Sequence, residues 1–111
     1  MTRTSGSLGP VQIGIIVLTL ATALIHITLA IPVNLIMFYL NGIGYIALVA
    51  ALYLPQLAAY RRYVRYALIA FAAVTVLGWA AVGERSTIAY IDKAVEIALI
   101  ALLIVEMRTA K

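Results

Sequence analysis

The sequence predicts an all-α integral membrane protein, a four-helix up-and-down bundle with both termini on the inner side. Three observations support this prediction. The 111 residues are 66% hydrophobic and only 11% charged, whereas a soluble domain is about half apolar and about a quarter charged. Four apolar runs approach the roughly 20 residues that a membrane-crossing helix needs. Lys and Arg are concentrated in alternate connecting segments, as in proteins that cross a membrane several times.

Prolines and short polar segments separate the four predicted crossings. Pro32 and Pro55 fall where a helix should end or begin. Ser86 or Thr87 is placed to cap the fourth helix. Abundant Ala and Leu, without alternation of polar and apolar residues, favour helices over the strands of a barrel. We expect the crossings at about 11–31, 34–54, 64–83 and 87–106.

The segments outside the bundle are short. Residues 1–10, MTRTSGSLGP, are polar and rich in small side chains, which is typical of a flexible tail. We therefore expect a cytoplasmic N-terminal tail over 1–10, a single bundle over 11–107 and a cytoplasmic tail over 108–111. The length suits one domain at most.

The distribution of charge predicts the orientation. If the N-terminus lies inside, the inner segments contain six cationic residues against one acid, Glu106, and the outer half contains Arg85 and Lys93 against three acids. An excess of Lys and Arg marks the cytoplasmic side. We therefore expect both termini inside the cell and the bundle in the plasma membrane. The six inner cations are Arg3, Arg61, Arg62, Arg65, Arg108 and Lys111.

The motif YRRYVRY at residues 60–66 interleaves arginine with tyrosine. Such interleaving also occurs in nucleic-acid-binding segments. Here the motif is short and lies between two crossings, where Tyr favours the headgroup depth and Arg contacts anionic lipid. We therefore predict a lipid-headgroup anchor and no nucleic-acid partner. The anchor residues are Tyr60, Arg61, Arg62, Tyr63, Arg65 and Tyr66.

Each crossing brings a polar or amphipathic residue to one depth in the outer half of the bundle. At 1.5 Å per residue, His26 lies about 8 Å below the outer end of its helix, and Asp92 and Glu96 lie about 6 and about 12 Å below Ile88. Residues three or four apart share a helix face, so Asp92 and Glu96 face the same way. We predict an intramembrane polar cluster of His26, Asn41, Trp79, Asp92, Lys93 and Glu96.

The roles of these residues remain alternatives at this point. Asp92 and Glu96 can form a proton- or cation-coupling pair, because neighbouring carboxylates in a poorly hydrated layer repel each other when both are ionised. They can equally belong to a static network in which Lys93 or His26 neutralises one acid. Lys93 lies about 100° around the helix from Asp92, so it can join the acids or extend outward. His26 is the only histidine, and a hydrogen-bonded role is favoured over haem ligation, so we expect no cofactor.

Small residues indicate where helices can approach closely. Gly42 and Gly44 lie beside Asn41 in the second crossing, and Gly78 lies beside Trp79 in the third. A further set lies along one side of the fourth crossing: Ala94, Ala98 and Ala101. We expect these positions to pack against neighbouring helices.

The sequence contains none of the residue sets that usually indicate a reaction. The absence of cysteine excludes disulfides, thiolate metal sites and cysteine nucleophiles. No Ser/His/Asp set, phosphate loop or metal-spaced cluster appears. We therefore expect a non-catalytic structural or accessory subunit of a larger membrane complex. The alternative is a small homodimeric transporter that couples to protons or cations through Asp92 and Glu96. The expected partners are membrane lipids and other membrane subunits or a second copy of the chain.

The size and four-crossing layout resemble the small multidrug resistance transporters, which exchange cationic drugs for protons. Those proteins carry their essential Glu in the first crossing, where this chain has His26 and no acid. LNGIGY at 40–45, YRR at 60–62 and DKAVE at 92–96, together with His26, resemble families of small prokaryotic membrane proteins. That resemblance implies four crossings and no particular activity.

Overall fold

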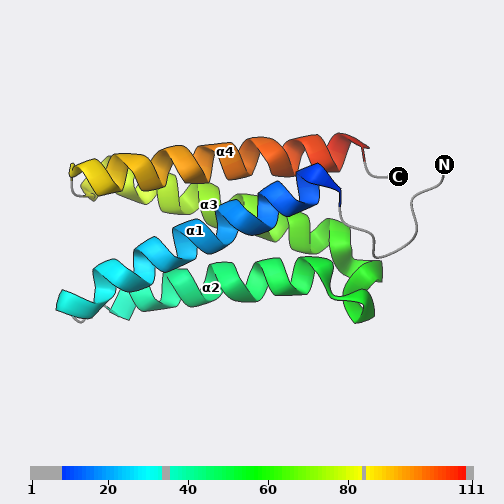
Figure 1. The fold of residues 1–111 in the computed structure, drawn as a ribbon, viewed down its shortest axis with the longest axis horizontal. Helices are drawn as coiled ribbons and strands as arrows, with labels where there is room; N and C mark the ends of the chain where they lie inside the picture. Colours follow the sequence, from blue (N-terminus) through cyan, green and yellow to red (C-terminus); the bar gives the residue numbers. More distant parts are fainter. Residues whose placement is uncertain (1–8, 34–35, 84, 110–111) are drawn as a thin grey trace.

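The computed structural model describes residues 9–33, 36–83 and 85–109, and these residues form four long helices and one short one (Figure 1). The predicted all-helical four-helix fold is confirmed, and the described residues contain no strand. Asn34, Glu84 and most of the two predicted tails lie outside the described residues. The helices are α1 (Pro10–Val33), α2 (Ile36–Tyr53), the 3-10 helix η1 (Pro55–Tyr60), α3 (Arg61–Val82) and α4 (Thr87–Thr109).

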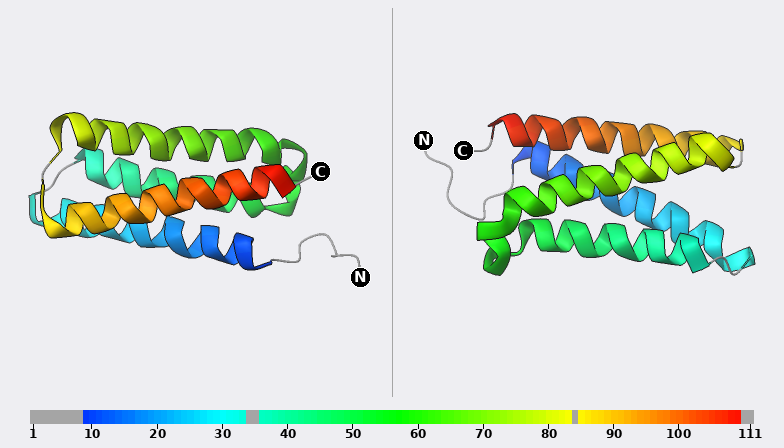
Figure 2. Two further views of the ribbon diagram at one scale, coloured as in Figure 1. Left: turned by 90° about the horizontal axis from the view of Figure 1, so that it is seen from above. Right: turned by 180° about the vertical axis from the view of Figure 1, so that it is seen from behind.

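The four long helices run up and down beside one another (Figure 2), and the contacts between them close a ring around one core. Helix α1 packs against α2 and α4, and α3 packs against the same two helices. The bundle measures 48 × 22 × 19 Å. We call the end with the start of α1, the end of α4 and η1 the termini end, and the opposite end the far end (Figure 1).

Local sequence signals set most of the helix ends. Pro10 begins α1 and Pro55 begins η1, since proline fits the first turn of a helix. Ser86 caps α4, because its Oγ accepts a hydrogen bond of 3.2 Å from the N–H of Ala89. Pro32 does not stop α1 where the sequence predicts, and lies inside its last turn.

The third long helix begins earlier than the sequence predicts. The YRRYVRY motif suggests a connecting segment before a crossing at 64–83, but Arg61 is already the first residue of α3. Neither Gly nor Pro occurs between Pro55 and Gly78, so η1 leads directly into α3. The side chain of Arg61 holds this junction, because its Nε donates a 2.7 Å hydrogen bond to the carbonyl of Leu52. As a result, residues 61–66 are helical, and the side chain of Arg65 points into the bundle.

An apolar layer fills the middle of the bundle. Its largest fully buried side chains are Ile15, Leu52, Leu68, Leu99 and Leu103, so every long helix contributes to it. Leu99 and Leu103 continue the face of α4 that carries Asp92 and Glu96, as expected for positions three and four apart. Polar side chains lie on either side of this layer.

Two of the predicted close-packing glycines are confirmed and one is wrong. A Cβ at Gly42 would lie 2.8 Å from the carbonyl oxygen of Ala23, and a Cβ at Gly44 would lie 2.6 Å from the ring of Phe71. Both glycines therefore bring α2 close to its neighbours. At Gly78 an added Cβ would meet nothing within 4 Å. The alanines predicted to pack, at positions 94, 98 and 101, are exposed on the outer surface of α4.

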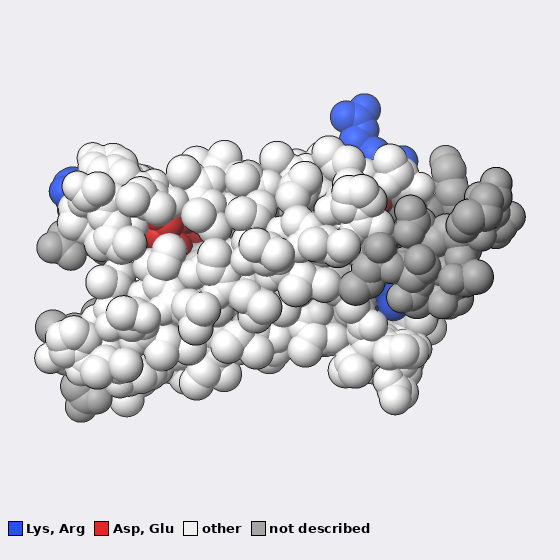
Figure 3. All heavy atoms as spheres, in the orientation of Figure 1, with Lys and Arg blue, Asp and Glu red and all other residues white. Residues whose placement is uncertain are grey.

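The flanks of the bundle are apolar. The outer faces of all four long helices expose large hydrophobic side chains, for example Leu24, Met37, Leu77 and Ile97. Most charged side chains in the space-filling view lie near the two ends (Figure 3). Pro10–Pro32, Ile36–Tyr53 and Pro55–Ala81 are long and apolar enough to cross a membrane. Helix α4 is also long, with 23 residues, but it carries Asp92, Lys93 and Glu96 within its apolar stretch.

Candidate functional site

The buried polar residues of the far-end half form one connected group. It contains Thr22 and His26 from α1, Tyr45 from α2, and Asp92, Lys93 and Glu96 from α4, and we call these six residues the His26 cluster. All six are at most 6% exposed. The structure therefore brings together four of the predicted site residues and adds Thr22 and Tyr45.

Lys93 joins the two acids of α4 instead of extending outward. Its Nζ donates a 2.6 Å hydrogen bond to Glu96 Oε1 and lies 3.1 Å from Asp92 Oδ2. Although Lys93 is rotated around the helix from Asp92, its long side chain reaches back across the helix surface. The ammonium thus neutralises part of the negative charge within the same helix.

Helices α1 and α2 supply the remaining donors to these carboxylates. The Thr22 hydroxyl lies 2.5 Å from Asp92 Oδ1 and 3.2 Å from Glu96 Oε2. Tyr45 donates a 2.6 Å hydrogen bond from Oη to Glu96 Oε2. Glu96, which is completely buried, is therefore held from three helices at once.

His26 connects the cluster to the backbone of its own helix. Its Nδ1 lies 2.9 Å from the carbonyl oxygen of Thr22, and its Nε2 lies 3.5 Å from Asp92 Oδ2. The ring packs edge-on against Phe38, with 5.5 Å between centroids, and Tyr45 packs edge-on against Phe71 at 4.8 Å. Aromatic rings from α2 and α3 thus enclose the polar atoms and keep their environment poor in water.

The other two predicted cluster residues make different contacts. Asn41 donates a 2.8 Å hydrogen bond from Nδ2 to Thr75 Oγ1 and links α2 to α3. Trp79 packs edge-on against Tyr90 at 5.3 Å, and the Arg85 guanidinium lies 4.3 Å from its ring centroid. Trp79 therefore belongs to an aromatic contact between the far-end parts of α3 and α4.

A second polar group, buried at Arg65 and Glu106 and half-buried at Gln12 and Tyr53, lies at the termini end, and the sequence reasoning missed it. We call Gln12, Tyr53, Arg65 and Glu106 the Glu106 cluster. Glu106 accepts hydrogen bonds of 2.7 Å from Arg65 Nε, 2.7 Å from Tyr53 Oη and 3.0 Å from Gln12 Nε2. One carboxylate on α4 thereby bonds to each of the other three long helices.

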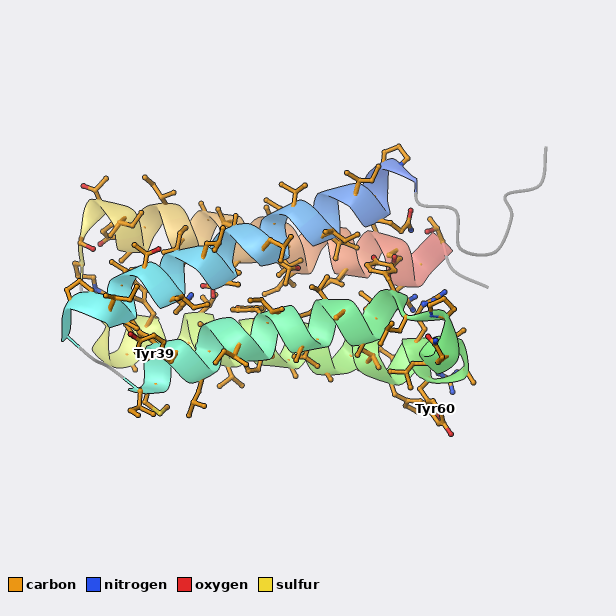
Figure 4. The ribbon with its side chains drawn as sticks, turned by 60° about the horizontal axis from the view of Figure 1, so that its bottom comes forward. Tyr39 and Tyr60 are labelled. Atoms are coloured by element: carbon orange, nitrogen blue, oxygen red, sulfur yellow. The ribbon has the colours of Figure 1, made fainter. Side chains whose placement is uncertain are left out.

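The six residues of the predicted headgroup anchor divide into two groups. Arg62, Tyr63 and Tyr66 are exposed, and so is Tyr60, which projects away from the bundle at the termini end (Figure 4). Tyr39 lies near the opposite end (Figure 4). Arg65 is only 5% exposed and pairs with Glu106. Arg61 is half-buried and bonds to the backbone.

Three residues of the His26 cluster have the chemistry of metal ligands. His26, Asp92 and Glu96 each offer one ligand atom, and these atoms lie within 4.8 Å of one another. However, the Lys93 ammonium already contacts both carboxylates. A metal cation there would be repelled by the ammonium, so Lys93 takes the cationic position between the two carboxylates.

The two clusters are separated by the apolar layer. Glu96 and Glu106 are ten residues apart on α4, which corresponds to about 15 Å. Between them the described buried side chains are apolar except for Thr19, whose hydroxyl bonds back to the Ile15 carbonyl at 2.6 Å. The described side chains therefore form no continuous polar path from one end of the bundle to the other.

Comparisons with family models, with curated proteins and with solved structures find no match for this chain.

Proposed function

We propose that the chain is a small plasma-membrane protein that crosses the bilayer four times, with both termini on the cytoplasmic side. We further propose that it is a non-catalytic structural or accessory subunit of a larger membrane complex. The observation that carries this proposal is the internal pairing of its buried charges. Each buried charged side chain of the described residues contacts a group of opposite charge in the same chain.

The same pairing supports α4 as the fourth crossing. Charged residues at membrane depth are tolerated when they face the bundle interior and pair with one another. Asp92, Lys93 and Glu96 are buried, whereas Ile91, Ile97 and the neighbouring alanines face outward. Lipid would therefore meet an apolar helix surface despite the charges in the sequence.

The proposed orientation is supported by the charged groups of the two ends. Arg61, Arg62, Arg65 and Arg108 belong to the termini end, and Arg85 lies at the far end. An excess of arginine favours the cytoplasmic side. Tyr60 and Tyr63, both exposed, suit the headgroup depth on that side.

The accessory role is supported by how the polar groups are used. The Glu106 cluster and the His26 cluster join the helices to one another and present little polar surface. The flanks, in contrast, offer apolar helix faces on every side. A bundle of this kind interacts with other molecules in the membrane through van der Waals packing of those faces, as a structural subunit does.

The mass of the gently solubilised assembly tests this proposal. The tagged chain, expressed at its native level, would be extracted in a mild detergent, and its mass would be measured by light scattering and native mass spectrometry. We expect larger membrane subunits to co-purify in fixed ratio and to dissociate in a harsh detergent. A homodimer without other subunits would contradict the accessory role.

A transporter coupled to protons or cations, working as a homodimer, is the second candidate. It is favoured by one observation: titratable side chains are grouped near the far end, and acidic atoms are visible between α1 and α4 in the space-filling view (Figure 3). Reconstituted liposomes test it, because Glu96→Gln should abolish ion or proton flux while the helical content stays intact. Flux that survives this substitution would eliminate Glu96 as the coupling group.

A further inference from the structure

The hydrogen bonds of His26 determine where one of its protons lies. Nδ1 is 2.9 Å from the carbonyl oxygen of Thr22, and a carbonyl oxygen can only accept. Nδ1 must therefore carry a hydrogen. In a neutral imidazole with hydrogen on Nδ1, the other nitrogen, Nε2, has a lone pair and no proton.

The surroundings of Nε2 favour a proton on that side as well. Nε2 faces Asp92 Oδ2 at 3.5 Å, and the same oxygen lies 3.1 Å from the Lys93 ammonium. A lone pair facing a carboxylate oxygen is repelled, whereas an imidazolium N–H is attracted. Because Asp92 Oδ2 is already paired with the Lys93 ammonium, we place the proton on Nε2 and not on the carboxyl group.

The net charge of the cluster also favours a proton on His26. Asp92 and Glu96 contribute two negative charges and Lys93 contributes one positive charge. Among the described residues, the neighbouring elements add no further charge to the contacts of the cluster. Helix α2 supplies the Tyr45 hydroxyl and the Phe38 ring, the arginines of α3, at 61, 62 and 65, lie in its first two turns, and Arg85 lies over the Trp79 ring. An unpaired buried charge is costly. A proton on His26 makes the cluster neutral.

We propose that His26 Nε2 and Asp92 Oδ2 form a proton-binding site that takes up one proton from water and returns it to water. Uptake converts a cluster of net charge −1 into a neutral one, and no other bond forms or breaks. The proposal does not depend on the proposed function, because a structural subunit and a transporter can both contain such a site.

The position of the site favours exchange with the far end. His26 is 5% and Asp92 3% exposed, while Glu96 is fully buried. Toward the termini end, the apolar layer with Leu99 and Leu103 lies below the cluster. A proton that reaches Asp92 from the far end therefore has a shorter path than one from the termini end.

Glu96 is the competing position for the proton. The Thr22 hydroxyl is near both carboxylates but has only one hydrogen to donate, so a protonated Glu96 could donate to Thr22 in return. Against this, Glu96 already accepts hydrogen bonds from the Lys93 ammonium and the Tyr45 hydroxyl. Both donors need oxygens that accept, so His26 is the better site.

Nitrogen NMR of the only histidine in the chain tests the proposal without ambiguity of assignment. The full chain, labelled with ¹⁵N-histidine, would be studied in lipid nanodiscs. At neutral pH we expect both ring nitrogens to be protonated. In Asp92→Asn the Nε2 proton should be lost, leaving the neutral form with hydrogen on Nδ1. The matched control is Glu106→Gln, the same kind of change in the other cluster, which should leave the His26 signals unchanged.

Two results would overturn the proposal. One is a neutral His26 ring in the wild-type protein at neutral pH, and the other is an imidazolium that persists in folded Asp92→Asn. If Asp92→Asn does not fold, the protonation of the His26 ring in the wild-type protein is the test on its own. On raising the pH, the proton should leave Nε2 and stay on Nδ1, and the opposite tautomer would contradict the assignment.

Discussion

Tyr45 and Glu96 connect two helices that lie diagonally across the bundle. The Tyr45 hydroxyl donates a 2.6 Å hydrogen bond to Glu96 Oε2, and both side chains are completely buried. Helices α2 and α4 are not neighbours in the ring, so a long side chain is needed to join them. The same diagonal is bridged at the termini end by Tyr53 and Glu106.

The first prediction concerns this bond. Tyr45→Phe should lower the free energy of unfolding by about 1–2 kcal/mol, because it removes a donor from a buried carboxylate while keeping the ring. Thermal unfolding followed by circular dichroism in detergent measures the change. Tyr60→Phe is the control, since Tyr60 is exposed at 59%, and it should change the stability by less than about 0.5 kcal/mol. Equal stability of the two variants would show that Glu96 does not need Tyr45.

The second prediction separates two arginines of one motif. Arg65→Ala should lower the free energy of unfolding by about 3–5 kcal/mol, because it leaves Glu106 as a buried charge without its cation. Arg62→Ala should have little effect on stability, because Arg62 is an exposed residue. Instead, it should weaken binding to anionic vesicles, which a vesicle co-sedimentation assay of the detergent-diluted protein would detect. A similar loss of stability in Arg65→Ala and Arg62→Ala would contradict the assignment of Arg65 to the interior of the bundle and of Arg62 to its surface.

The third prediction compares two glycines. Gly42→Ala should lower the free energy of unfolding by about 1–3 kcal/mol, because the new Cβ would lie 2.8 Å from the Ala23 carbonyl oxygen, which is backbone and cannot move aside alone. Gly78→Ala meets open space and should be neutral or stabilising by up to about 1 kcal/mol. Chemical unfolding of both variants in the same detergent checks the difference. A destabilised Gly78→Ala variant would indicate that another molecule packs against this face.

The sequence alone predicts the four long helices, though not the start of α3, and it predicts the meeting of His26 with Asp92 and Glu96. Both predictions depend on regular quantities, the length of an apolar run and the rise per residue of a helix. The sequence does not determine the position of the Lys93 side chain, because the angle of a residue around the helix does not say how far a long side chain reaches back.

The Glu106 cluster was missed for a different reason. The sequence places Arg65 and Glu106 among the charges of the inner surface, because they stand near the ends of predicted crossings. A usable signal was present: Glu106 lies three residues after Leu103 and seven after Leu99, on the buried stripe of α4. Arg65 likewise lies three residues before the buried Leu68 and seven before the buried Ala72. What the sequence could not give is the pairing of the two, which depends on how α3 and α4 are packed.

The fourth prediction concerns the apolar layer between the two clusters. Leu99→Asn places an amide about one turn below Glu96 and should admit water toward the Glu106 cluster. In reconstituted liposomes it should therefore increase the rate at which an imposed pH gradient decays. Leu99→Ala is the matched control, since it opens a cavity without a polar group and should lower the free energy of unfolding by about 2–5 kcal/mol without increasing proton leakage. If both variants leak alike, loosened packing would explain the leak. If neither leaks, the layer is not what separates the two clusters for protons.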